Sequence, residues 1–90
     1  MNLKAEFVRY MPEAKAMQDG TVYISAEYET AIHRCACGCG KQTVTPFGDG
    51  GWTLTLDNGK VTLSPSIGNQ RFNCKSHYLI QAGEVVWLDR

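Results

Sequence analysis

Three cysteines stand within five residues of this chain, and a fourth thiol returns far along the sequence. The segment Cys35-Ala36-Cys37-Gly38-Cys39-Gly40 carries the three, and Cys74 is the fourth. Alternate residues of an extended strand lie about 6.6 Å apart, whereas two sulfurs on one tetrahedral zinc can be no more than about 4 Å apart. The backbone must therefore curl sharply between the ligands. Gly38 and Gly40 allow this, because glycine tolerates the positive φ of a tight turn.

Two other states of the cysteines are open to such a sequence. Cysteines one residue apart would form a strained ring, so the only comfortable disulfide joins Cys74 to one of the three. The cysteines could also be small buried apolar groups. The first six residues show no apolar stretch behind a basic start, so we expect no signal peptide and a cytoplasmic protein. Cytoplasmic thiols stay reduced, and we therefore predict zinc.

The ligand set follows from the same residues. Four thiolates, from Cys35, Cys37, Cys39 and Cys74, would close the site and make it structural. A histidine, His33 or His77, could replace one cysteine and give a mixed set. Three cysteines and a histidine with an open position would instead make a catalytic site. We predict the closed four-thiolate zinc site.

Length and charge narrow the class of protein further. A chain of 90 residues makes one domain, 1–90, and so small a core usually needs a staple such as a metal. Nine basic and nine acidic side chains give zero formal net charge, and no basic patch is visible. Binding to nucleic acid is therefore not favoured. No apolar run approaches the ~18 residues that a membrane span requires.

Short segments with period-two patterning predict a mostly β fold. Asn58-Gly59 is the preferred pair for a two-residue hairpin turn, and it joins the alternating arms of Trp52–Leu63. We expect Trp52, Leu54 and Leu56 on the inward face of this hairpin. Residues 25–31 are compatible with either a helical turn or a loop. The predicted fold class is a small zinc-stapled antiparallel sheet or partial barrel, with the cysteine turns at one edge. The other predicted strands are 6–10, 21–25, 78–80 and 85–88.

Side chains near the cysteines also suggest chemistry. A serine nucleophile needs a base within hydrogen-bond reach, and the base needs an orienting partner. Ser66 with His77, oriented by His33 or Asn69, is such a constellation. Ser66 could equally be a turn hydroxyl that bonds its own backbone after Pro65. Sequence alone does not show that these residues meet.

Several motifs occur together between about Tyr23 and Trp87: His33-x-Cys35-x-Cys37-Gly38-Cys39-Gly40, Thr45-Pro46, Trp52-x-Leu54, Pro65-Ser66-Ile67-Gly68-Asn69 and Cys74-x-Ser76-His77-Tyr78. Together they resemble a family of small bacterial proteins known as a domain of unknown function. Members of that family look like components of operons that encode ubiquitin-like proteins with their activating and conjugating enzymes. Some of these operons are tied to phage defence.

The resemblance implies a small hydrolase that processes or deconjugates a ubiquitin-like protein. Carried onto this chain, Ser66 would be the nucleophile and His77 the base, with His33 orienting. The zinc would hold the two halves of the site together, since Cys74 lies three residues from His77. A different class of function, a non-catalytic zinc module that binds a protein partner, is the alternative.

Overall fold

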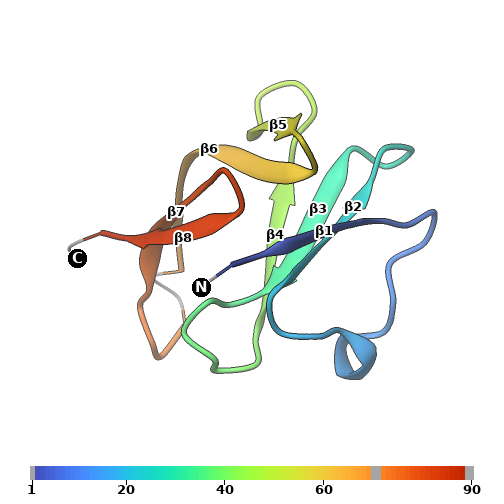
Figure 1. Ribbon diagram of the computed structural model, residues 1–90. Helices are drawn as coiled ribbons and strands as arrows, with labels where there is room; N and C mark the ends of the chain where they lie inside the picture. The colour runs from blue at the N-terminus through green and yellow to red at the C-terminus, as the bar shows by residue number, and fades with distance from the viewer. Residues whose placement is uncertain (1, 70–71, 89–90) are drawn as a thin grey trace.

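The computed structural model describes residues 2–69 and 72–88 and is mostly β, as predicted. Two four-stranded sheets pack together without closing into a barrel, as Figure 1 shows. The first sheet has the order β1-β2-β3-β4 and the second the order β5-β6-β7-β8. The elements are β1 (Lys4–Phe7), the 3-10 helix η1 (Ala14–Ala16), β2 (Thr21–Ser25), β3 (Thr30–Arg34), β4 (Gln42–Pro46), β5 (Thr53–Asp57), β6 (Lys60–Gly68), β7 (His77–Gln81) and β8 (Glu84–Trp87).

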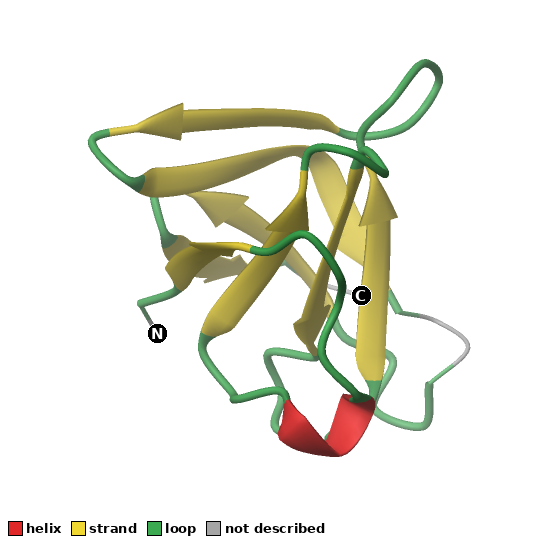
Figure 2. Cartoon of the chain, turned by 90° about the vertical axis from the view of Figure 1, so that its right-hand side faces the viewer, coloured by secondary structure: helices red, strands yellow, loops and turns green. Residues whose placement is uncertain are grey.

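The first sheet differs from the prediction in the position and pairing of its first strand and in its last two strands. β1 spans Lys4–Phe7, whereas residues 6–10 were predicted. β1 pairs with β2 in parallel, and the connection between them carries η1, drawn in red in Figure 2. β3 and β4, which pair antiparallel, were not predicted from the sequence. Residues 26–29 form a turn, one of the two forms expected for this segment, and Glu29 ends it with a φ of 49°. The Ser25 hydroxyl accepts the Tyr28 N–H at 3.3 Å. That turn reverses the chain, so β3 returns alongside β2.

The second sheet contains the predicted hairpin. Asn58 and Gly59 have φ values of 53° and 77°, as the two-residue turn requires, and Leu54 pairs with Leu63. The inward-face prediction is wrong for Leu56, which is 38% exposed. β5 is an edge strand of its sheet, and four of its five residues are exposed. β6 continues past β5 and pairs with β7, and its register shifts between Leu63 and Ile67. Ser66 stands in this irregular stretch.

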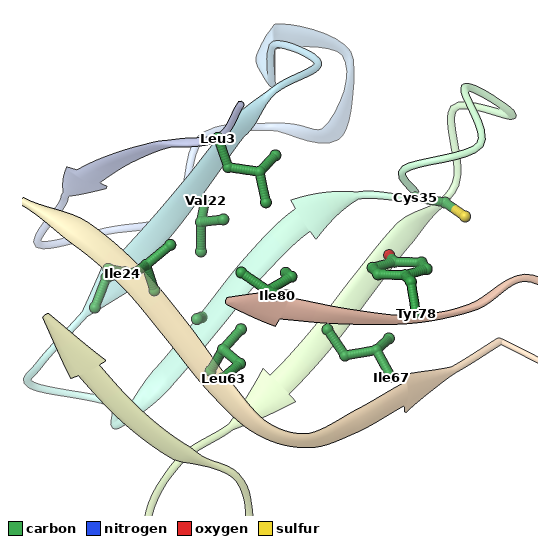
Figure 3. Close-up of a cluster of buried hydrophobic side chains, with 10 residues drawn as sticks. Leu3, Val22, Ile24, Cys35, Leu63, Ile67, Tyr78 and Ile80 are labelled. Carbon is green, nitrogen blue, oxygen red and sulfur yellow. The ribbon is translucent and has the colours of Figure 1, made fainter. Parts of the chain in front are cut away.

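The core lies between the two sheets. Figure 3 shows the buried side chains of β2 facing those of β6 and β7. The core ends beside the cysteine segment, where Cys35 lies next to Tyr78. Within the described ranges, no helix is long and apolar enough to cross a membrane. The residues that carry this core include Val22, Ile24, Leu63, Ile67, Tyr78 and Ile80, each at most 1% exposed.

Candidate functional site

The three early cysteines lie in the turn between β3 and β4. The Cys35 N–H bonds the Lys41 carbonyl at 2.8 Å and closes the base of the turn. Inside it, the Gly38 N–H bonds the Cys35 carbonyl at 3.1 Å. Gly38 and Gly40 have φ values of 89° and 85°, so the glycines supply the curl that the spacing demands.

Cys74 lies in the loop between β6 and β7, and its sulfur completes a group of four. All four Sγ atoms lie within 4.8 Å of one another. The Sγ of Cys35 is 3.5 Å from that of Cys37 and 3.7 Å from that of Cys74, and Cys74 is 4.0 Å from Cys39. All four cysteines are free, since these separations far exceed a sulfur–sulfur bond of about 2 Å.

This donor set fits a metal ion. Two thiolates on a tetrahedral zinc, each about 2.3 Å from it, stand roughly 3.8 Å apart. Three of the sulfur pairs, at 3.5, 3.7 and 4.0 Å, lie close to this value. The group consists of Cys35, Cys37, Cys39 and Cys74, and neither His33 nor His77 belongs to it. Within the group, contact with Ser76 lowers the pKa of the Cys74 thiol to about 6, whereas burial raises the pKa of the Cys37 thiol to about 12. The spacing of the sulfurs, and not these pKa values, therefore indicates a metal site.

Ser66 and His77 meet on the second sheet. The Ser66 Oγ lies 2.9 Å from the His77 Nε2, within hydrogen-bond distance. Strand register brings them together, because Gly68 of β6 stands opposite His77 of β7 and Ser66 shares the face of Gly68. Both side chains are half-buried, so they can reach a substrate while remaining partly shielded from water. The distance is the one that a serine nucleophile and a histidine base require.

His33 lies elsewhere. Its Nε2 is 2.7 Å from the Tyr78 hydroxyl, and its ring packs edge-on against the tyrosine ring. The side chain is 1% exposed, and its Nδ1 has no hydrogen-bond partner among the described residues. Burial lowers the pKa of His33 to about 4 and raises that of Tyr78 to about 12, so both groups are neutral at pH 7. The described contacts of His33 therefore lead to the core and not to Ser66.

Asn69, the other residue considered as an orienting partner for His77, makes its described hydrogen bonds elsewhere. Its Nδ2 donates to the Ser76 Oγ at 3.1 Å and to the Cys35 Sγ at 3.5 Å. Asn69 thus belongs to the surroundings of the cysteines. Ser76 is a site residue that was not predicted, although alternation along the chain indicates its position. In a β-strand successive side chains point to opposite faces, so Ser76 and Tyr78 point inward if His77 points outward.

The buried His33 predicts a distinct pH dependence of stability. Its folded pKa of about 4 lies below the ordinary value of 6.5, so the unfolded chain takes up the proton first as the pH falls. The stabilisation is fully present above pH 6.5, and about 3 kcal/mol of the free energy of unfolding is lost between pH 6.5 and 4. Urea unfolding of the wild type and of His33→Gln across this window should give curves that converge at low pH. Parallel curves would contradict the assignment, since acid release of a metal affects both proteins alike.

Most of the chain matches a known protein family. The family model described as "Bacterial ubiquitination-like system serine protease (BubE)" matches residues 7–88. No curated protein and no solved structure matches the chain. The matched range includes both members of the Ser66–His77 pair and all four cysteines. The chain therefore belongs to the BubE family of serine proteases from bacterial ubiquitination-like systems.

Proposed function

We propose that this protein is a zinc-stabilised serine hydrolase that processes or deconjugates a bacterial ubiquitin-like protein. The observation that carries the proposal is the 2.9 Å contact between the Ser66 Oγ and the His77 Nε2. The family supplies the class of partner, because proteins of a ubiquitination-like system act on protein substrates. The expected setting is the cytoplasm, in a phage-defence operon, and residues 1–90 act as a single domain.

The mechanism uses the chain's own residues at each step. The Ser66 Oγ attacks the carbonyl carbon of the scissile bond while the His77 Nε2 takes the hydroxyl proton. The tetrahedral intermediate collapses as His77 returns that proton to the leaving amine, and the acyl group remains on Ser66 as an ester. A water molecule then loses a proton to His77 and attacks the ester, which releases the carboxylate and restores Ser66.

The four cysteines would hold zinc in a closed structural site. Bound there, the metal supplies cross-linking of two loops and no step of the reaction. Cys74 lies on the loop that ends at β7, three residues before His77, whereas the other three lie between β3 and β4. A metal at this point would fix the start of β7. His33 supports the same strand from inside through Tyr78, and we assign it this positioning role.

Reaction with a fluorophosphonate probe tests the activated serine without knowledge of the substrate. Such a probe reacts with a hydroxyl that a neighbouring base activates, so the wild type should gain one adduct on the peptide that carries Ser66. His77→Gln should lose the adduct. Ser64→Ala removes an exposed serine two residues along β6 and should label like the wild type. Equal labelling of wild type and His77→Gln would overturn the proposal.

A non-catalytic protein-binding module is the second candidate. Tyr10 and Tyr28 are 66% and 58% exposed, and their ring centroids lie 6.4 Å apart. Exposed aromatic pairs are common anchors in protein interfaces. This candidate requires that the ubiquitin-like protein binds tightly and leaves intact. Cleavage in the same mixture would exclude it.

A further inference from the structure

Two polar side chains, those of Asn69 and Ser76, lie within hydrogen-bond distance of the Cys35 sulfur. We propose that Thr43, Asn69 and Ser76 form a hydrogen-bond relay that ends on the Cys35 sulfur and holds it as a metal-bound thiolate. The inference rests on the zinc site of the proposed function, and it is independent of the chemistry of Ser66. The three relay residues are positioning residues, because none of them would touch the metal.

Burial singles out Cys35 among the four cysteines. Its side chain is 2% exposed, whereas Cys37 and Cys39 are exposed and Cys74 is half-buried. Water can donate hydrogen bonds to the exposed sulfurs. A buried thiolate has no such access, and leaving a buried charge without donors is costly. The protein itself must therefore supply the donors to Cys35.

The distances trace a continuous path to that sulfur. The Thr43 hydroxyl donates to the Asn69 Oδ1 at 3.4 Å, and the Asn69 Nδ2 donates to the Ser76 Oγ at 3.1 Å. The Ser76 Oγ in turn lies 3.0 Å from the Cys35 Sγ. All three relay residues are buried, with exposures of 6%, 8% and 2% in the order Thr43, Asn69, Ser76.

Either Ser76 or Cys35 could donate in their contact, and the bond from Asn69 favours Ser76 as the donor. An amide nitrogen only donates, so Ser76 accepts from Asn69 and its own hydroxyl proton remains free to donate. The Ser76 Oγ lies 3.0 Å from the Cys35 Sγ and 3.5 Å from the Cys74 Sγ, so we assign its proton to the nearer sulfur, that of Cys35. The Cys35 sulfur also receives the second Asn69 proton at 3.5 Å. Two donors thus converge on one sulfur. Such an arrangement suits a thiolate, which accepts without donating.

The relay also joins the two loops of the site. Thr43 belongs to β4 in the first sheet, and Asn69 and Ser76 stand at the two ends of the loop that carries Cys74. The Asn69 N–H bonds the Ser76 carbonyl at 2.8 Å and closes that loop. Residues that donate to a metal's ligands typically change metal affinity about 10–100-fold when they are lost.

Zinc competition with a chromogenic chelator tests the relay. Ser76→Ala should raise the zinc Kd about 10–100-fold. Asn69→Asp keeps the shape but turns a donor into an acceptor that faces the sulfur, so its Kd should rise at least as much. The near-isosteric Thr43→Val, which removes only the outermost donor, should give a smaller rise. Ser64→Ala, an exposed serine on β6, is the control and should stay within about twofold of the wild type.

Cobalt spectra separate hydrogen bonding from packing. Loss of a donor to a thiolate raises the energy of its lone pairs, so the sulfur-to-cobalt charge-transfer band of Ser76→Ala should move to longer wavelength. Zinc affinities within about twofold of the wild type for Ser76→Ala and Thr43→Val would overturn the relay. An unmoved cobalt band with weakened binding would also overturn it, because the role would then be packing. If zinc binding behaves as expected while Ser66 does not react with the probe, the hydrolase proposal fails and the relay stands.

Discussion

Replacing Ser66 with alanine is expected to lower kcat for cleavage of a ubiquitin-like tail at least about 10⁴-fold. Alanine removes the oxygen that would form the ester, and the His77 Nε2 at 2.9 Å would have no proton to accept. The substrate for this assay is the ubiquitin-like protein of the same system with a short C-terminal extension. Cleavage is followed by mass spectrometry of the released fragment.

Matched variants make this result specific to the nucleophile. Ser64→Ala changes a neighbouring exposed serine of β6 and should retain the wild-type rate. Zinc content and the melting temperature of Ser66→Ala should match those of the wild type, because its hydroxyl lies apart from the four sulfurs. An alanine variant that keeps more than about a tenth of the wild-type rate would rule out a serine nucleophile.

Removal of the metal should lower the melting temperature by at least about 10 °C. Binding of a structural zinc supplies about 10–16 kcal/mol, comparable to the whole stability of a small domain. Here the metal would tie the turn between β3 and β4 to the loop that carries Cys74, and Cys35 is itself part of the buried core. Circular dichroism melts with and without a strong chelator measure the effect.

Two controls show whether the chelator acts by removing the metal: the return of zinc and the substitution of a cysteine. Returning zinc to the stripped protein should restore the original melt, and magnesium should not, because thiolates favour softer metals. Cys74→Ser should melt like the chelated wild type. A melting temperature unaffected by both treatments would mean that the four cysteines do not form a stabilising metal site.

Local patterns predicted the parts of the fold that local physics decides. The Asn58-Gly59 turn formed because few other pairs take positive φ twice in succession. β3 and β4 were not predicted because they carry polar residues, such as His33 and Thr43, at buried positions, where a strand pattern normally has apolar ones. Those polar groups find partners on distant strands, so their burial follows from tertiary structure. The parallel pairing of β1 with β2 likewise depends on how the two sheets stack.

In the candidate site, too, some features follow from local sequence and others from tertiary structure. Glycine placement predicted a curled cysteine turn, and the structure has it. The proximity of Ser66 and His77 depends on the register of β6 against β7, which the sequence does not encode locally. The sequence predicted His77 as the base and His33 as its orienting partner. The structure places His77 beside Ser66, whereas His33 points into the core toward Tyr78. The position of His33 depends on how the two sheets pack, because its partner Tyr78 belongs to the other sheet.

The most direct test of the serine mechanism is the site of covalent attachment during turnover. The reaction with the ubiquitin-like substrate is stopped in acid after a few turnovers, and the acylated peptide is mapped by mass spectrometry. The serine mechanism predicts an ester on Ser66 that is absent in Ser66→Ala. The exposed thiols of Cys37 and Cys39 are the competing nucleophiles. A thioester on either of them, with turnover that survives Ser66→Ala, would contradict it.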